Sequence, residues 1–136
     1  MEDLFLKISR REIPSACVYE DERFFAFLDI QPCNKGHVLV IPKMHFRNIF
    51  DMDAESFSAL ARVVHTIALA TKEATGADGI NIVMNNEVAA GQEIFHAHVH
   101  IIPRFVDDKV FAPPRHTTYA EGEMETVAEE IRSALL

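Results

Sequence analysis

Apolar residues recur along the chain with two periods, and the longest pattern is helical. Between about Asp53 and Thr75 they follow one another at spacings of three and four, as on one face of an α-helix. Gly76 comes next, and glycine readily adopts the left-handed conformation that ends many helices. We therefore predict one long amphipathic helix that ends at Gly76. Its core-facing side comprises Phe57, Leu60, Ala61, Val64, Ile67, Ala68 and Thr71.

Short runs rich in β-branched and aromatic residues predict five strands. Residues 16–20 and 24–28 flank a polar turn and are expected to form a hairpin. Residues 37–42 are an apolar run typical of a buried central strand, and residues 80–85 and 95–102 flank a turn-rich loop. Because strands and helices segregate along the chain rather than alternate, we predict an α+β fold with an antiparallel five-stranded sheet.

Both ends of the chain are expected to be helical. Residues 4–13 could form a short helix that ends before Pro14, because proline disfavours helical geometry in the residue preceding it. Residues 121–136 carry a stripe of four apolar residues that one helix face would share, namely Met124, Val127, Ala128 and Ile131. The chain of 136 residues has no repeat and no Gly- or Pro-rich linker, so a single domain over 1–136 is expected.

The composition limits what the chain can bind. It is 49% hydrophobic and 25% charged, and it has no apolar run approaching the roughly eighteen residues that cross a membrane. Its net charge of -8 disfavours broad contact with a nucleic-acid backbone. The first residues lack the basic and apolar segments of a secretion signal, and Cys17 and Cys33 are too few for a disulfide scaffold. We expect a cytoplasmic protein that binds neither membranes nor nucleic-acid polymers.

The candidate chemistry of the chain centres on His96, His98 and His100. In a strand, alternate side chains point to one face, so the three imidazoles would share a working surface. Their outer α-carbons would then lie roughly 13 Å apart, at about 3.3 Å per residue. Zinc needs every ligating nitrogen within about 2 Å, so the three histidines can hardly hold one ion, and no metal is expected.

An imidazole can instead act as a covalent nucleophile through one ring nitrogen when an acceptor holds the proton of the other. Neighbouring histidines would fix that orientation and donate hydrogen bonds to an anionic substrate. In the preceding loop, residues 89–93, Gly91 permits close approach of the backbone to a phosphate, although any connection between two strands could have this composition. A chance polar face is the alternative, but strict alternation of three histidines disfavours it.

The histidines and their surroundings resemble the histidine-triad (HIT) family of nucleotide hydrolases and transferases. The family signature is three histidines separated by single apolar residues and followed by two further apolar residues. The resemblance covers about residues 4–105 and leaves residues 106–136 as a C-terminal extension. The matching apolar residues are Ala97, Val99, Ile101 and Ile102, and the other matching segments are Leu28–Pro32, Gly36–His45, Asn85, Gly91–Gln92 and Pro103–Arg104.

This resemblance implies a role for each histidine. The middle histidine of such proteins attacks the α-phosphorus of a nucleotide conjugate, so His98 would be the nucleophile that forms a nucleotidyl-histidine. His100 would contact the phosphate, and His96 with His37 would form the hydrogen-bond relay that sets the tautomer of the nucleophile. Asp29 would bind the ribose hydroxyls, because a carboxylate accepts from two neighbouring donors.

The resemblance also implies a nucleotide pocket and an assembly. Apolar residues would enclose the purine, although by pattern alone each of them is more often plain core. The implied nucleotide contacts are Phe5, Ile8, Phe27 and Ile30 at the purine, Asn85, Gly91, Gln92 and Glu93 at the phosphate, and Val99. Two five-stranded sheets of the family join edge to edge, so we expect a homodimer, in which each sheet covers an edge of the other.

Two features depart from the family pattern. Many bacterial relatives carry a Cys-x-x-Cys pair that binds a structural zinc together with the equivalents of His45 and His96. Here the cysteine positions are Asp3 and Leu6, so we expect no zinc, and no other cofactor is expected. Glu93 stands where some phosphoramidases place a serine that helps protonate the departing amine, which a carboxyl could do only if it carried a proton.

Three functions follow from the resemblance. The first is a purine nucleoside phosphoramidase, which cleaves amine conjugates of AMP or GMP and is favoured by the short chain and the spacing from Gly91 to His96. The runner-up is a dinucleoside polyphosphate hydrolase that uses the same nucleophile. The third is a nucleotide-binding or interaction module with little turnover.

Overall fold

The computed structural model describes residues 3–135, which form one five-stranded sheet, three α-helices and a single 3₁₀ turn. In chain order the elements are α1 (Leu4–Ser9), β1 (Cys17–Glu20), β2 (Phe24–Leu28), β3 (Val38–Pro42), α2 (Ala54–Thr75), β4 (Gly79–Val83), η1 (Val88–Ala90), β5 (Val99–Arg104) and α3 (Glu123–Ala134). The strands lie in the order β1-β2-β3-β5-β4, and all neighbouring pairs are antiparallel. The predicted α+β fold with an antiparallel five-stranded sheet is confirmed.

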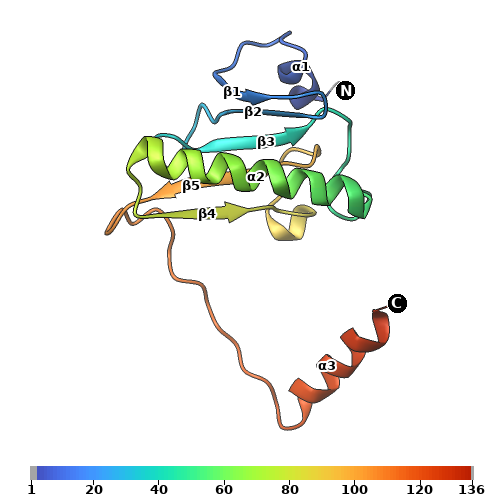
Figure 1. Cartoon of the computed structure of the whole chain (residues 1–136). Coiled ribbons are helices and arrows are strands. Elements are labelled where there is room, and N and C mark those ends of the chain that lie inside the picture. The colour runs from blue at the N-terminus through green and yellow to red at the C-terminus, as the bar shows by residue number, and fades with distance from the viewer. Residues whose placement is uncertain (1–2, 136) are drawn as a thin grey trace.

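The two faces of the sheet are covered by different helices (Figure 1). Helix α2 packs on one face against Val40, Val99 and Ile101, in a core made almost entirely of aliphatic side chains. Helix α1 packs on the other face against Phe27 and Leu39 of β2 and β3. Because α1 has only six residues, it covers less of its face than the 22-residue α2 covers of the opposite one. The face under α1 therefore has room for a pocket.

The long helix has the ends that the sequence predicted. Asp53 accepts a hydrogen bond from the backbone N–H of Ser56 and so caps the first turn. Gly76 ends the helix with φ 71°, in the left-handed region where a side chain would be disfavoured. Both caps lie within one residue of the boundaries expected from the apolar pattern.

Two expected elements are shorter in the structure. The helix expected over residues 4–13 ends at Ser9, and Arg11 has a φ of 62°, which a continuing helix does not allow. The strand expected over residues 95–102 begins at Val99. The backbone N–H of Ala97 donates to the carbonyl of Phe46, 2.7 Å away and outside the strand ladder, so only the last triad histidine lies within the strand.

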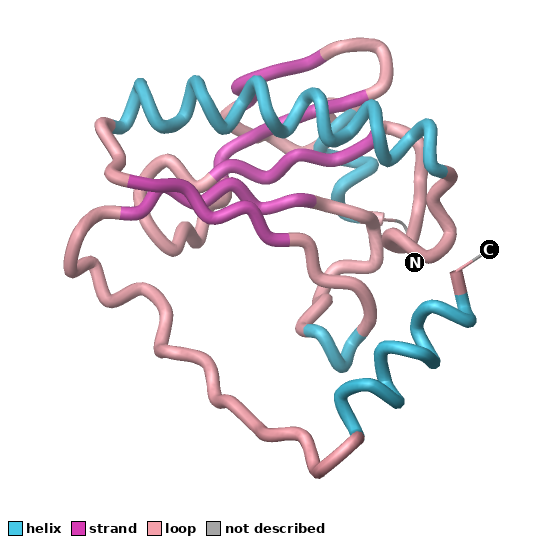
Figure 2. Tube along the Cα trace, turned by 60° about the horizontal axis from the view of Figure 1, so that its bottom comes forward, coloured by secondary structure: helices cyan, strands magenta, loops and turns pink. Residues whose placement is uncertain are grey.

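The C-terminal extension leaves the sheet after β5 and stands away from it (Figure 2). Asp108 holds its start, because both of its carboxylate oxygens accept from the guanidinium of Arg104. Residues 111–126 are all exposed, and the helix predicted for 121–136 is present as α3; residue 136 lies outside the described residues. None of the helices in residues 3–135 is both long and apolar enough to cross a membrane.

Candidate active site

A cavity of about 580 Å³ opens on the sheet face that α1 partly covers. Its volume is in the range of small-molecule sites. Most of the residues that the resemblance implicates line it, namely Phe5, Ile8, Phe27, Asp29, Ile30, His37, Asn85, Gly91, Glu93, His98 and His100. The chain therefore gathers these residues from α1, β2, β3, β5 and the loop after β4 around one space.

The tautomers of His37 and His100 follow from a chain of hydrogen bonds. The backbone N–H of Cys33 donates to Nδ1 of His37 across 3.1 Å, so that nitrogen carries no proton. The proton of His37 is then on Nε2, which lies 2.9 Å from Nδ1 of His100. Nδ1 of His100 accepts this hydrogen bond, so the proton of the neutral His100 ring is on its Nε2. An N–H of His100 is therefore available as a donor in the pocket.

The tautomer of His98 is fixed by the main chain. Its Nδ1 lies 2.7 Å from the carbonyl oxygen of His96, and a carbonyl can only accept, so Nδ1 carries the proton. In the neutral ring, Nε2 then has a free lone pair. No buried side-chain nitrogen or oxygen in residues 3–135 lacks a partner, so this unbonded Nε2 is accessible from the pocket. An accessible lone pair of this kind suits a nucleophile.

Burial keeps these three histidines neutral. It lowers the pKa of His98, an effect to which the neighbouring charge of His96 adds and which the hydrogen bond to the His96 carbonyl opposes. Burial lowers the pKa of His100 to about 4, with His98 and His37 adding to the shift. Burial also lowers the pKa of His37, against the opposing charge of Asp29. All three rings are therefore uncharged at neutral pH.

His96 lies apart from this row, and the expected relay between His96 and His37 is wrong. The Nε2 of His96 donates to the carbonyl of Pro42 across 2.7 Å, and its Nδ1 is hydrogen-bonded to the carboxylate of Asp3. The side chain of His96 has no exposed surface and does not line the pocket. It is the backbone carbonyl of His96, rather than its ring, that sets the tautomer of His98.

Val99 is a second correction to the expected contacts. Its side chain is buried among the residues that pack against α2, and it pairs across the sheet with Val40. Since alternate residues of a strand face opposite sides, Val99 points away from the cavity that His98 and His100 line. It is a core residue and cannot offer its side chain to a nucleotide in this pocket.

Gln92 is a third correction, because its polar atoms are all engaged within the protein. Its Nε2 donates to the carbonyls of Arg47 and Ile94, at 2.7 and 3.1 Å. Its Oε1 accepts from the backbone N–H of Glu87 and from the side-chain amide of Asn48, at 2.9 and 3.1 Å. Only 3% of Gln92 is exposed. It therefore holds the loop in shape and leaves contact with a ligand to its neighbours.

That loop presents Asn85, Gly91 and Glu93 to the pocket. Gly91 has φ 92°, and a side chain added there would meet the amide of Asn85 at 3.8 Å. Glu87 also has a positive φ of 81°, a conformation that L-residues rarely adopt. Its carboxylate accepts from the guanidinium of Arg47 at 2.8 and 3.0 Å, which holds the strained residue in place. The loop is thus fixed before any ligand binds.

Sequence reasoning missed Asp3 as a residue of the site. Its carboxylate accepts from the backbone N–H of Phe5 at 2.9 Å and so caps α1, and it is also hydrogen-bonded to His45 at 2.9 Å and to His96. Partial burial tends to raise the pKa of Asp3, but the hydrogen bonds from His45 and His96 outweigh it and lower that pKa. An aspartate directly before an apolar run is an N-cap signal that could have identified it as a fixed residue.

Two groups of side chains bring three possible metal ligands within 4.8 Å of one another: Asp3 with His45 and His96, and Asp29 with His37 and His100. Ligand atoms around a tetrahedral zinc, at bond lengths of about 2.0 Å, lie roughly 3.3 Å apart. The Asp3 carboxylate instead lies at hydrogen-bond distance from both of its histidines, as does His37 from His100. Leu6 offers no fourth ligand. The first group is hydrogen-bonded in this structure, and it comprises three side chains that could ligate a metal.

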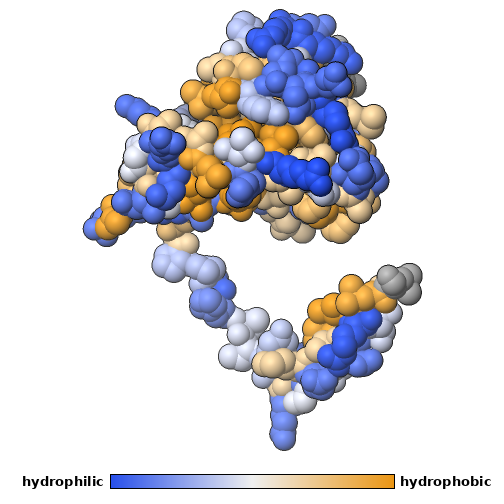
Figure 3. Space-filling view, in the orientation of Figure 1, coloured by the Kyte–Doolittle hydropathy of each residue, from blue (hydrophilic) through white to orange (hydrophobic). Residues whose placement is uncertain are grey.

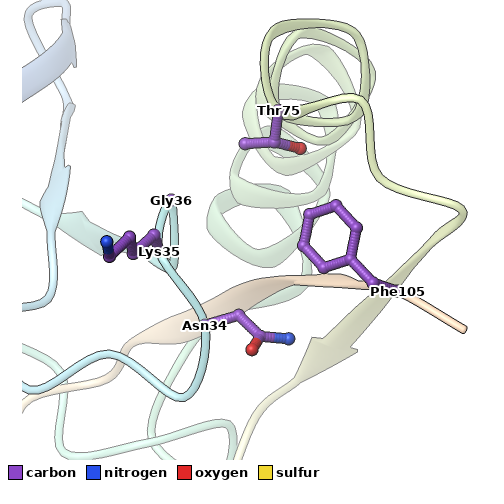
Figure 4. Close-up of a pocket in the computed structure, with 5 residues that line it drawn as sticks. All are labelled: Asn34, Lys35, Gly36, Thr75 and Phe105. Carbon is purple, nitrogen blue, oxygen red and sulfur yellow. The ribbon is translucent and has the colours of Figure 1, made fainter. Parts of the chain in front are cut away.

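A second hollow lies beside the end of α2 (Figure 4). It is lined by Asn34, Lys35, Gly36, Thr75 and Phe105 and has a volume of about 630 Å³. Lys35 is the only ionisable residue in its lining, and no pair of acid, base or nucleophile faces it. The hollow offers no group arranged for catalysis.

Comparison with known proteins agrees with this geometry. The family model of the HIT domain matches residues 10–107. The chain belongs to the HIT family. It is 49% identical over 106 residues to an uncharacterised HIT-like protein of Methanocaldococcus jannaschii, which covers 77% of this chain and 81% of that protein. It is 40% identical to the purine nucleoside phosphoramidase of Escherichia coli K12, over 74% of this chain and 86% of the enzyme.

Three further relatives match nearly the whole of this HIT protein. The adenylylsulfatase HINT3 of Arabidopsis thaliana is 37% identical over 97% of this chain and 68% of its own length. A crystal structure of a Streptococcus mutans protein superposes with a TM-score of 0.93 at 44% identity, covering 99% of this chain and 86% of the other. A Bacillus subtilis HIT protein superposes with a TM-score of 0.92 at 37% identity, over 100% of this chain and 99% of that one.

Proposed function

We propose that this HIT protein hydrolyses purine nucleoside 5'-phosphoramidates to a nucleoside monophosphate and an amine, through a covalent intermediate on His98. The observation that carries the proposal is the fixed tautomer of His98, which points an unprotonated Nε2 into the pocket. A neutral imidazole with its other N–H held by a carbonyl is prepared for nucleophilic attack. The named hydrolases among its relatives support this chemistry.

The reaction has two steps. In the first, the lone pair of His98 Nε2 forms a bond to the α-phosphorus, and the bond from phosphorus to the amine nitrogen breaks with its electron pair going to the nitrogen, which takes up a proton. In the second, water forms a bond to the phosphorus, and the bond from phosphorus to Nε2 breaks with its electron pair returning to the ring. The water loses a proton, which balances the one that the amine took up. The Nδ1–H bond to the His96 carbonyl would stabilise the positive ring of the intermediate. The N–H of His100 would donate to a phosphoryl oxygen.

The rest of the pocket suits a nucleoside. Phe5, Ile8 and Phe27 give it an apolar wall, as a purine ring requires. Asp29 lies at its rim with 22% of its side chain exposed, so its carboxylate can accept from two ribose hydroxyls. The three pocket histidines are neutral, so the carboxylates of the pocket lining are those of Asp29 and Glu93.

Substrate comparison tests the proposal. Steady-state rates should be measured with adenosine 5'-phosphoramidate, adenylyl sulfate and diadenosine tetraphosphate, at several concentrations of each. Adenylyl sulfate is included because one relative is named for it. We expect the largest kcat/KM for the phosphoramidate. A preference for diadenosine tetraphosphate of more than about tenfold would replace this substrate class with the dinucleotide one. Tight binding of AMP without turnover of any substrate would indicate a binding module.

We also propose that the C-terminal extension packs on a second copy of this chain in a homodimer. Met124 and Ile131 of α3 are 62% and 59% exposed, and seven residues apart they share one side of the helix. An apolar stripe runs along one side of α3 (Figure 3). The hydrogen bonds made by residues 112–135 lie within that segment, in the part of the chain described. Two solved relatives superpose with TM-scores of 0.93 and 0.92 over 99% and 100% of the chain, extension included, which supports this placement of the extension.

Light scattering after size-exclusion chromatography tests the homodimer. The double substitution Met124→Glu with Ile131→Glu should convert a dimer to a monomer at micromolar concentration, because it places charges on the buried apolar face. The matched control is Thr126→Glu with Ser133→Glu, which adds the same charge to the opposite side of α3 and should leave the dimer intact. A monomeric wild-type chain would contradict the homodimer. Loss of the dimer in both variants, or in neither, would contradict the interface.

A further inference from the structure

The charged side chains that line the histidine-lined cavity are acidic. Asp29 and Glu93 contribute carboxylates, whereas burial keeps the rings of His37, His98 and His100 neutral. In the part of the chain that the structure describes, no lysine or arginine lines this cavity. The whole chain has 21 acidic and 13 basic side chains, so the surroundings of the cavity are negative as well. A ligand with several negative charges is therefore repelled here, and a positive group is attracted.

The two carboxylates of the cavity differ in what holds them. Oδ1 of Asp29 accepts from the backbone N–H of Gln31 at 2.8 Å, and Oδ2 lies 3.9 Å from Nε2 of His37. Glu93 is exposed, and its carboxylate has no hydrogen bond or ion pair with the other residues of the described chain. The negative charge of Glu93 is therefore available to a ligand.

The backbone on both sides of Glu93 is anchored. The side chain of Gln92 is buried and donates to the carbonyls of Arg47 and Ile94, at 2.7 and 3.1 Å. On the other side, Ile94 packs against the buried residues under α1. The loop therefore holds the backbone of Glu93 beside the cavity, while its side chain can turn toward a ligand.

A nucleotide bound as proposed above would leave Glu93 unoccupied. The purine would lie against the apolar wall beside α1, and Asp29 would accept from the ribose. In an in-line displacement, the departing amine lies on the far side of the phosphorus from Nε2 of His98. Among the charged side chains of the described lining, Glu93 is then the one that the nucleotide does not engage. It can pair with a group carried by the amine.

We propose that Glu93 is a specificity-determining residue, which selects phosphoramidates whose amine portion carries a second, positively charged group. This inference deepens the proposed function and rests on it. Such a conjugate has one negative charge at the phosphoryl group and one positive charge at its far end. The far ammonium group keeps its protons and takes no part in bond breaking. It would pair with Glu93, whereas a far carboxylate would be repelled.

Three adenosine 5'-phosphoramidates of similar length test the inference. Their amines are n-pentylamine, 1,4-diaminobutane and 4-aminobutanoate, so their far ends are a methyl group, an ammonium group and a carboxylate. Glu93→Gln keeps the size of the side chain and removes its charge. The matched control is Glu22→Gln, the same change at an exposed residue in the turn between β1 and β2, outside the cavity lining.

The first measurement is kcat/KM for each conjugate, at low and high salt. In the wild type and in Glu22→Gln we expect the order ammonium, methyl, carboxylate, with smaller differences at high salt. In Glu93→Gln the ratio of the ammonium to the methyl conjugate should fall by about threefold or more, as for the loss of an exposed charge pair. The same ratio in Glu93→Gln and wild type, or an equal fall in Glu22→Gln, would overturn the inference.

The second measurement does not depend on turnover. Calorimetry gives the dissociation constants of the three conjugates in the His98→Ala background, with Glu93 or with Glu93→Gln. The ammonium conjugate should bind more tightly than the methyl conjugate, and Glu93→Gln should reduce this difference by about threefold or more. This result without hydrolysis by the wild type would reject the hydrolase and keep the charge preference. Hydrolysis with ratios that do not depend on Glu93 would keep the hydrolase and overturn this inference.

Discussion

The two faces of strand β5 differ in what they contain and in how they are held. On the α2 side, Val99 and Ile101 are buried in a continuous aliphatic core. On the other side, His100 and the residue just before the strand, His98, face a cavity, and each ring is held by a single hydrogen bond. Neighbouring residues from His98 to Ile101 therefore serve chemistry and packing in turn.

This difference indicates how the reactive side chains of His98 and His100 can be held in fixed positions. The side chains under α2 have no polar atoms, so close packing holds the strand backbone in place. The side chains on the pocket face need empty space for substrate, so packing cannot hold them, and hydrogen bonds to the carbonyl of His96 and to His37 do so instead. Loss of an aliphatic residue should therefore affect stability, and loss of a histidine should affect turnover.

The largest expected effect is on the pocket face. His98→Ala should lower kcat by about 10⁴-fold or more, because it removes the nucleophile. Binding of AMP and the thermal unfolding temperature should change little, which calorimetry would measure on the same sample. Residual activity of more than a few per cent would show that another group attacks phosphorus.

The opposite pattern is expected on the α2 face. Ile101→Ala removes a side chain with no exposed surface and should lower the free energy of unfolding by about 2–5 kcal/mol. Chemical denaturation would measure this loss. The kcat of the folded fraction should stay close to that of the wild type, because Ile101 points away from the cavity. A large loss of kcat without a loss of stability would mean that the two faces are not separable in this way.

A smaller effect concerns pH. The reactive form of His98 is neutral, and burial lowers its pKa below the ordinary value of 6.5. As pH falls, protonation removes the lone pair, so kcat/KM should decline along an acidic limb whose midpoint lies below pH 6.5. His100, with a pKa of about 4, would protonate later. An acidic limb centred above pH 6.5 would contradict a buried, neutral nucleophile.

Much of the fold could be predicted because its signals are local. The spacing of apolar residues determined the long helix from Asp53 to Gly76, and the β-branched runs located each strand to within a few residues. The resemblance to the family also predicted that His98, His100 and Asp29 would contact one ligand, and all three line one pocket. These features depend on which residues are apolar and on short motifs, and both are visible in the chain.

The errors concern long-range polar partners and the backbone around them. Asp3 is 93 residues from His96 in the chain, and nothing local to either residue indicates their hydrogen bond. Gln92 resembles a phosphate-loop residue, yet its partners at Arg47 and Asn48 turn it inward. Such pairings depend on the whole fold. The family pattern grouped the position of Asp3 with His45 and His96, but it did not predict the hydrogen bonds between them.

The most direct test of the account is detection of the covalent intermediate. Adenosine 5'-phosphoramidate is mixed with the enzyme, quenched within milliseconds, and followed by intact mass and peptide mapping. We expect an adduct with the mass of an adenylyl group on the peptide that contains His98, appearing before steady state and missing from His98→Ala. Full turnover with no adduct at any quench time, or an adduct on His37 or His100, would contradict His98 as the nucleophile.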